Sequence, residues 1–576
     1  MEWDLDILFK NQKQLQETKN IARQSAISFE EQYKGKLAKL KAEEFETALN
    51  KYEDIIESLE RIMSYAYLRF ASQTTEGAML SECELHVNAT MEHLLFFELE
   101  FGNLTPTQSQ YFIKHAPRYA YYLSLIVENH KHQRSDAEER IILKLSPVGA
   151  NAFSRLFSEH FSRLKVPLEN QEYSEEEILS QLHHTKRHKR KKAARAFTQV
   201  LKKEKDLFAY ILNIVRKEWS IIGEIRQYTT PEEPRHIDNQ TTQHSVDTMI
   251  QVVNQNMGIV AEFYTIKKEL MGYDTLYDYD RYAPLFNNKI RFDFEYSKKI
   301  VLESFQEFSP LFAEIATKAF NEQWIDSHPR ENKQSGAFSH STVPKAHPFI
   351  LLNHTNNRKD VFTMAHELGH AIHQELSKKV GCLNAHTPLT TSETASVFAE
   401  MLLFDKIKNQ LKGKEKAALY AAKLEDIFAT LFRQTVFTNF ERRIHAEQGE
   451  LSAEQFNHIW QEENQKMFGD SLTLTSHYAL WWSYIPHFIH SPFYCYAYSY
   501  GQLLVLALFG LYRRNQNNRA EFTQKYVEFL SAGGSRSPRE LVALFGFDIE
   551  SEEFWKIGIQ EIHILLEEFK KIITNK

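Results

Sequence analysis

Apolar residues recur at every third or fourth position along most of the first 200 residues. In the stretch FEEQYKGKLAKLKAEEFETALNKYEDIIESLERIMSYAYLRFA this spacing gathers apolar side chains on one face of a helix. The stretch YGQLLVLALFGLY, from Tyr500 to Tyr512, is almost wholly apolar but too short to cross a membrane, so it predicts a core helix. The pattern predicts a mostly α fold that begins with successive amphipathic helices.

The pattern changes between about residues 335 and 355, in SGAFSHSTVPKAHPFILLNHT. Short apolar runs interrupted by VPKA predict two short strands joined by a turn, and Phe349–Thr355 is the better strand candidate. A helical pattern resumes directly afterwards. A strand pair beside that helix suits a cleft, because a strand edge can pair with an extended peptide.

The length of the chain predicts more than one compact region. A chain of 576 residues is too long for one ordinary hydrophobic core, so we expect two or more subdomains. Glycine (19) and proline (15) are scarce, which favours helices over turns. We expect an N-terminal helical region over 1–197 and a catalytic domain over 198–576.

Charge and cysteine content exclude several classes of protein. A net charge of −7 on this length gives no argument for a nucleic-acid or membrane partner. Three widely separated cysteines, Cys83, Cys382 and Cys495, argue against a disulfide framework and against a cysteine zinc site. The start MEWDLDILFK lacks the basic and apolar segments of a signal peptide, so we expect a cytoplasmic protein.

The strongest run of positive charge is HHTKRHKRKKAARAF, from His183 to Phe197. Such a run suits either a nucleic-acid patch or a solvated helix face. The run is isolated in an acidic protein and follows the acidic stretch SEEEIL, which favours the helix face and no nucleic-acid partner.

The motif HExxH follows the predicted strands, as His366, Glu367 and His370 within TMAHELGHAIHQEL. Residues four apart lie one turn apart on the same helix face, so the two imidazoles can converge on one tetrahedral Zn²⁺. Glu367 borders that face and can act as general base toward a zinc-bound water. Apolar residues at helical spacing predict that the opposite face of this helix is buried.

His373 lies too far along the helix axis to be the third ligand, at about 10 Å beyond His366. It suits support of a ligand, a position near the substrate, or simple packing. The longer metzincin pattern requires glycine and histidine where this chain has His373 and Leu376, which excludes that class.

The stretch LTTSETASVFAEMLLF supplies a third ligand, Glu393. Thr391 and Ser392 are good N-cap residues, so a helix is expected from about Glu393, and Gly381 and Pro388 allow the chain to turn back. Two histidines, one glutamate and water form a catalytic zinc set. An acidic residue in a first helical turn is also favoured by the helix dipole alone.

A carboxylate seven residues beyond Glu393, Glu400, lies on the same face of the expected helix. It can hold one of the ligands from behind and orient it.

An aromatic stretch, WWSYIPHFIHSPFYCYAYSYGQ, lies near the C-terminal end. Ser491 and Pro492 read as the cap and first position of a helix, on which Tyr494 and Tyr498 would share a face. His487 and these tyrosines can donate hydrogen bonds to the oxyanion formed in amide hydrolysis. An aromatic core helix explains the same residues.

Three blocks, MAHELGHAIH, SETASVFAE and HFIHSPFYCYAYSYGQ, together with the opening WDLDILF and the strand PFILLNHT, resemble the oligoendopeptidase F branch of the thimet oligopeptidase-like zinc metallopeptidases. The resemblance spans essentially the whole chain. It implies a mostly helical, two-lobed shell around a deep channel that admits short unstructured peptides, with a small sheet beside the zinc helix.

Carried over by position, the resemblance implies that His366, His370 and Glu393 bind one Zn²⁺ per chain and that Glu367 is the general base. His487 with Tyr494 or Tyr498 corresponds to the histidine and tyrosine that assist the oxyanion and bind substrate.

The tyrosine spacing differs from that of the thimet branch, so Tyr496 stays an alternative as a substrate-binding residue. The strand Phe349–Thr355 would align the peptide by pairing, at Leu351, Leu352 and Asn353.

These observations predict a zinc-dependent endopeptidase that acts on oligopeptides. A carboxypeptidase-type exopeptidase on the same scaffold, or a non-catalytic peptide-binding protein, is the alternative. The oligomeric state stays open, and a monomer is compatible with every prediction made from the sequence.

Overall fold

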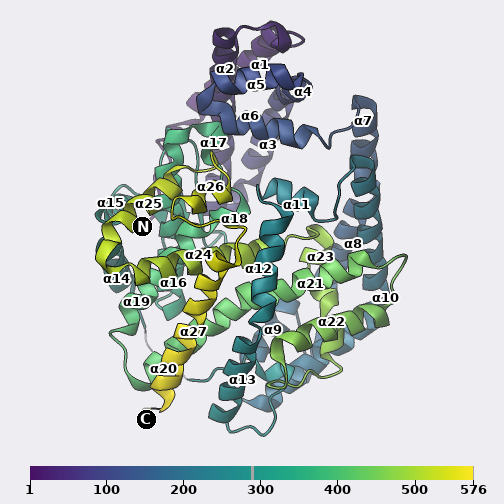
Figure 1. Cartoon of the computed structure of the whole chain (residues 1–576), viewed down its shortest axis with the longest axis vertical. Helices are drawn as coiled ribbons and strands as arrows, with labels where there is room; N and C mark the ends of the chain where they lie inside the picture. Colours follow the sequence, from purple (N-terminus) through teal and green to yellow (C-terminus); the bar gives the residue numbers. More distant parts are fainter. Residues whose placement is uncertain (287–290, 575–576) are drawn as a thin grey trace. The chain divides into compact units, whose positions relative to one another are not determined.

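The computed structural model of the chain describes residues 1–286 and 291–574 (Figure 1). Helices account for 73% of the residues and strands for 3%, which confirms the predicted mostly α fold. No helix in these two ranges is long and apolar enough to cross a membrane.

The chain forms two compact units, and each is assembled from three separate stretches. The first comprises Met1–Lys131, Lys289–Gln410 and Tyr512–Phe547, and the second comprises His132–Asn288, Leu411–Leu511 and Asp548–Lys576. The boundary expected at residue 197 falls inside the long helix α10 (Arg187–Arg226). The separation of an N-terminal region from a catalytic region therefore stays a prediction about function.

The first unit contains helices from both halves of the chain and one small sheet. Its elements are α1 (Gln12–Tyr33), α2 (Ala42–Ser72), α3 (Gly77–Met91), α4 (Leu95–Gly102), α5 (Pro106–His115), α6 (Ala120–His130), α14 (Phe294–Phe308), α15 (Pro310–Asn321), β3 (Ile325–Asp326), β4 (Phe338–His340), β5 (Phe349–Leu351), α16 (Arg358–Ser377), α17 (Cys382–Ala385), α18 (Leu389–Ser392), α19 (Thr394–Lys408), α25 (Arg519–Ser531) and α26 (Pro538–Ala543).

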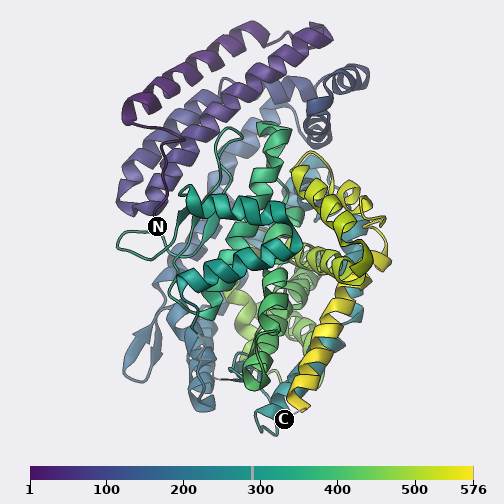
Figure 2. The ribbon, with the colours of Figure 1, turned by 90° about the vertical axis from the view of Figure 1, so that its left-hand side faces the viewer.

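The N-terminal helices follow the amphipathic pattern of their sequence. Helices α1 and α2 run side by side (Figure 2) and bury their apolar faces together. Phe45 on α2 stacks on Phe112 at 4.1 Å and on Phe101 at 5.5 Å between ring centroids. Burial of such rings is the main term that stabilises this part of the unit.

The three-stranded sheet has the order β3-β5-β4, with β5 in the centre. Strand β5 pairs in parallel with β3 and antiparallel with β4, so both of its edges are occupied. The predicted strand from Phe349 begins correctly but ends at Leu351. The sheet contacts α16, which confirms the predicted small sheet beside the HExxH helix.

The second unit is helical apart from one hairpin, β1 (Val166–Leu168) with β2 (Gln171–Tyr173). Its helices are α7 (Asp136–Leu145), α8 (Ala150–Arg163), α9 (Glu175–Ser180), α10, α11 (Glu233–Asp238), α12 (Gln243–Gln255), α13 (Gly258–Leu270), α20 (Gly413–Ile427), the π-helix η8 (Phe428–Phe432), α21 (Arg433–Ala446), α22 (Ala453–Phe468), the 3-10 helix η9 (Tyr478–Tyr484), α23 (His487–His490), α24 (Tyr496–Arg514, as far as Leu511) and α27 (Glu552–Thr574). Helix α27 packs along α20 (Figure 1).

The basic run begins helix α10. Arg187 and Arg190 each make an ion pair with the buried Asp280, at 2.7 and 2.8 Å. Both arginines are therefore paired inside the fold. In α24 the residues from Leu503 to Phe509 are fully buried, as the predicted core helix requires.

Candidate metal centre and active site

The HExxH motif lies on α16, which begins at a capping box. The Asn357 side chain accepts a hydrogen bond from the Asp360 backbone N–H, and the Asp360 side chain accepts one from that of Asn357, both at 3.1 Å. Val361, Ala365 and Leu368 are buried as expected, but other faces of the helix are buried too. Because α14, α15, α19 and α25 all pack on α16, the prediction of a single buried face was too narrow.

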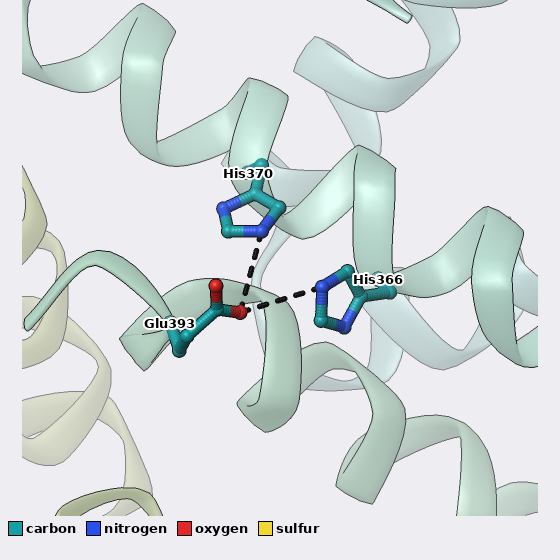
Figure 3. Close-up of side chains that lie close together, drawn as sticks. All are labelled: His366, His370 and Glu393. Atoms are coloured by element: carbon teal, nitrogen blue, oxygen red, sulfur yellow. Dashed lines mark ion pairs between the residues drawn. The ribbon is translucent and has the colours of Figure 1, made fainter. Parts of the chain in front are cut away.

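The three predicted ligands converge, as Figure 3 shows. The Nε2 atoms of His366 and His370 lie 3.3 and 3.4 Å from Oε2 of Glu393. All three donor atoms lie within 4.8 Å of one another. Two imidazoles and one carboxylate match the donors that Zn²⁺ takes in catalytic sites, so the residues fit this metal.

Glu393 is the N-cap residue of α19 and follows the short helix α18. The helix expected from Glu393 therefore starts one residue later. Gly369 explains why α19 comes so close to the histidines: a Cβ at this position would lie 2.6 Å from the carbonyl oxygen of Ala395. A hydrogen bond of 2.7 Å from Ser396 Oγ to Glu393 Oε2 holds the carboxylate in place.

The electrostatics of the site favour a bound cation. Burial opposes protonation of His366, but the hydrogen bond and charge of Glu400 outweigh it and raise the pKa of His366 to about 9. Burial also opposes ionisation of Glu393, yet His370 and His366 lower the pKa of its carboxyl to about 2. Both pKa shifts arise because the carboxylates of the site are stabilised by nearby positive charge, which a divalent metal can supply.

Glu400 contacts the imidazole of His366, one of the three candidate ligands, from the side away from Glu393. Its Oε1 lies 2.7 Å from His366 Nδ1. A carboxylate at Nδ1 holds the proton there and leaves Nε2 free to face a metal.

We expect Glu400→Gln to weaken zinc binding about 10- to 100-fold, because the amide loses the charge that fixes the imidazole. Competition with a chelating dye measures this affinity without any substrate. The matched control is Asp405→Asn on the same helix, where the carboxylate pairs with Lys408 at 2.6 Å. Equal affinities for the Gln variant and the wild type would contradict the positioning role of Glu400.

Glu367 and His373 line one cavity together with the ligands. The cavity has a volume of about 390 Å³ and is lined by Ala337, Phe338, Ser339, His366, Glu367, His370, His373, Gln374, Ser377, Ala385, Thr387, Ser392 and Glu393. Burial raises the pKa of Glu367 and lowers the pKa of His373 to about 3. His373 therefore stays neutral, and its position in the cavity wall fits a place near the substrate or simple packing.

The cavity reveals residues that the sequence reasoning missed, namely Ala337, Phe338 and Ser339 at β4. Strand β4 is an outer strand of the sheet, and two hydrogen bonds fasten it to α16. Ser339 Oγ donates to Gln374 Oε1 at 2.7 Å, and Gln374 Nε2 donates to the carbonyl of Ser339 at 3.1 Å. The sequence GAFSH mixes apolar and polar residues, whereas FILL is wholly apolar. A mixed composition is typical of a partly exposed strand, so it could have indicated the outer strand.

The expected pairing of a peptide with Phe349–Thr355 is corrected by the sheet order. Leu351 and Leu352 are 0% and 2% exposed, and both edges of β5 are already paired. Leu351 is therefore enclosed in the sheet, whereas Leu352 and Asn353 line a second cavity of about 290 Å³. Asn353 donates to the backbone carbonyls of Gln334 and Gly336, so its amide holds the segment that leads into β4.

His487, Tyr494 and Tyr498 form a cluster within the second unit. His487 Nε2 lies 3.3 Å from the Tyr498 hydroxyl, and the two tyrosine rings are 5.1 Å apart. The predicted helix start at Ser491 is wrong: α24 begins at Tyr496, after Phe493 with a positive φ of 57°.

Tyr496 is a core residue and not a substrate contact. It is fully buried, and its hydroxyl lies 3.0 Å from His236 Nδ1 and 2.9 Å from Asn239 Nδ2. The substrate-binding role expected for Tyr496 is therefore corrected, because every polar group of the ring is already engaged.

Family comparisons cover most of the chain. The sequence model described as Peptidase family M3 matches residues 180–561, and the one described as Oligopeptidase F matches residues 100–165. An oligoendopeptidase F homolog of Borreliella burgdorferi is 26% identical over 99% of this chain and 98% of its own length. Oligopeptidase PepF of Bacillus subtilis is also 26% identical, over 94% and 83%.

Solved structures share the fold. Oligoendopeptidase-F from Enterococcus faecium superposes with a TM-score of 0.72 at 21% identity, over 98% of this chain and 99% of its own. A protein from Chlamydophila abortus superposes with a TM-score of 0.89 at 24% identity, over 99% and 98%. At such identities the likeness supports the architecture alone.

Proposed function

Because the chain is a member of peptidase family M3, we propose that it is a zinc-dependent endopeptidase that hydrolyses internal bonds of short, unstructured oligopeptides. Membership makes the protein a peptidase, and the relatives named oligoendopeptidase F support oligopeptides as its substrates. The convergence of His366, His370 and Glu393 is the observation that carries the metal dependence.

A Zn²⁺ ion held by these ligands would lower the pKa of a coordinated water and polarise the scissile carbonyl. Glu367 borders the same cavity and has a carboxyl whose burial makes it a stronger base than in water. It accepts the proton of the attacking water and later delivers it to the leaving amine.

The substrate is aligned along β4, whose residues line the cavity. An extended peptide on an outer strand gains main-chain hydrogen bonds whatever its sequence, which suits a peptidase of mixed oligopeptides. His487 and Tyr498, with Tyr494 beside them, carry the proposed role of donors to the oxyanion. This last assignment follows the family resemblance.

A peptide blocked at both ends distinguishes an endopeptidase from an exopeptidase. We expect the protein to cleave such a peptide at an internal bond, with phenanthroline abolishing cleavage and added Zn²⁺ restoring it. Mass spectrometry of the fragments provides the measurement.

Release of single C-terminal residues, and only from unblocked peptides, would identify a carboxypeptidase. Cleavage that persists in the chelator would remove zinc from the mechanism. A zinc-loaded protein that binds peptides and cleaves none would be a non-catalytic peptide-binding protein.

A further inference from the structure

Two arginines of the second unit, Arg281 and Arg433, lie near each other without a carboxylate partner. Within the described chain neither guanidinium has a carboxylate oxygen within 4.0 Å, the limit for an ion pair. Arg281 is only 4% exposed, and Arg433 is half-buried. Buried charges in proteins are normally paired, because removing an unpaired charge from water costs roughly several kcal/mol.

Arg281 is surrounded by tyrosine hydroxyls, which accept its hydrogen bonds, and by tyrosine ring faces. Its Nη1 and Nη2 donate to the hydroxyls of Tyr478 and Tyr282 at 3.0 and 2.7 Å. The guanidinium also lies over both rings, 4.5 Å from the centroid of Tyr282 and 5.1 Å from that of Tyr478. Its buried Nε has no partner. Tyrosines stabilise the cation but do not neutralise it.

Arg433 is the first residue of α21 and directly follows the π-helix η8. Single π-helical turns are rare and occur frequently at functional sites. Nη2 of Arg433 donates to the Tyr484 hydroxyl at 3.1 Å, and the side chain lies 4.9 Å from the ring centroid of Phe437. The buried Nε has no partner, and Nη1 makes no hydrogen bond to any described residue.

The neighbouring ionisable groups do not neutralise the charges of Arg281 and Arg433. Burial has the larger effect on the pKa of the Asp278 carboxyl and raises it overall, although the charge of Arg281 lowers it. This carboxyl accepts a hydrogen bond from the Thr475 backbone N–H at 2.6 Å. Lys267 is neutralised by its own partner, Glu425. Although burial opposes ionisation of the Tyr282 hydroxyl, Arg281 and Arg433 together lower its pKa.

Arg433 also lies close enough to His487, for which a role toward the substrate is proposed above, to affect its pKa. Burial, and then the charge of Arg433, lower the pKa of His487. The buried Nδ1 of His487 has no hydrogen-bond partner. Arg433 therefore lies near both Arg281 and the imidazole of His487, whose Nε2 is 3.3 Å from the Tyr498 hydroxyl.

We propose that Arg433, supported by Arg281 and the hydroxyl of Tyr484, binds a carboxylate group of the peptide substrate. The inference rests on the proposed peptidase function. An arginine offers paired N–H donors to a carboxylate and stays charged at every physiological pH. The carboxylate is either the free C-terminus of the peptide or an acidic side chain.

Paired peptides that differ only at the C-terminus test the proposal. We expect wild-type kcat/KM to be about 10- to 100-fold higher for the free carboxylate than for the C-terminal amide, as for hydrogen bonds to a charged group. In Arg433→Met this ratio falls to about one. Arg443→Met on the same helix is the matched control, because Arg443 pairs with Glu462 and Glu463 and should keep the wild-type ratio.

A second series identifies the source of the carboxylate. Amidated peptides that carry either glutamate or glutamine at one position test whether Arg433 binds an acidic side chain. In each series the ratio of kcat/KM for the charged peptide to that for the neutral peptide is measured. A ratio that falls to about one in Arg433→Met, in either series, supports a carboxylate site at Arg433. Arg433→Lys keeps the charge without the planar fork and should give an intermediate ratio. Thermal unfolding confirms that each variant is folded.

The outcomes separate this inference from the proposed function. If the wild type cleaves neither form of the peptide, the proposed function fails. If it cleaves all peptides with equal kcat/KM, or Arg433→Met keeps the ratio, the carboxylate site is overturned while the peptidase stands. If acetate or chloride raises cleavage of both forms equally, and only when Arg433 is present, the arginines hold a free anion and the peptide carboxylate is likewise excluded.

Discussion

Glu367→Gln should lower kcat about 10²- to 10⁴-fold, the contribution expected from a positioned general base. The amide is nearly the same size as the carboxyl, so the 6%-exposed site repacks without a void. It cannot accept the proton of water. Glu367 contributes none of the three converging donor atoms, so metal content should match that of the wild type.

Kinetics and metal analysis on one preparation decide this prediction. Glu375→Gln, on the same helix, is the matched control: Glu375 pairs with Lys378 and does not line the cavity. That variant should keep kcat within about twofold, since surface ion pairs contribute little. A Glu367→Gln enzyme that carries zinc and turns over at the wild-type rate would remove Glu367 from the reaction.

The convergence of the three candidate ligands could be predicted because their geometry is mostly local. A spacing of four residues fixes His366 and His370 on one helix face wherever the helix lies. Glu393 follows after a short connection, so few paths of the chain are open to it. The predicted helix start was one residue early, which is the usual scale of error at a helix terminus.

The sheet could not be predicted with the same certainty, because its order depends on long-range pairing. The two residues of β3 carry no strand pattern of their own, yet their pairing with β5 makes β5 the central strand. The strongest strand signal, at Phe349, therefore marked the strand least able to meet a peptide. The partly polar β4 occupies the outer position beside the cavity.

The tyrosines between Trp481 and Gln502 could not be assigned to the core or to the site from their own segment alone. Tyr496 and Tyr498 are two positions apart and look alike in the sequence, but the first meets His236 and Asn239 in the core. Only the partners, contributed by a distant part of the chain, distinguish the two tyrosines. The approach of Arg281 to Arg433 is a tertiary feature of the same kind.

Gly369→Ala should separate α16 from α19 at the point where the two helices bring the candidate metal ligands together. The added Cβ would lie 2.6 Å from the carbonyl oxygen of Ala395 and 2.7 Å from the Cα of Ser396, both backbone atoms that cannot rotate away. Relief of this clash requires α19 to move from α16, and Glu393 at its N-cap moves with it. We expect the free energy of unfolding to fall by about 1–3 kcal/mol, the usual cost of overpacking.

The loss of activity should exceed the loss of stability, because the ligand set is displaced. A shift of about 1 Å in a reacting geometry can cost about 10²-fold in rate, and zinc affinity should fall in parallel. Thermal unfolding, chelator competition and kcat/KM provide the three measurements. Gly223→Ala in α10 is the matched control: a Cβ there meets nothing within 4 Å, and alanine's helix propensity should leave stability equal or slightly higher. If Gly369→Ala binds zinc and turns over like the wild type, the close crossing of α16 and α19 is not what positions Glu393.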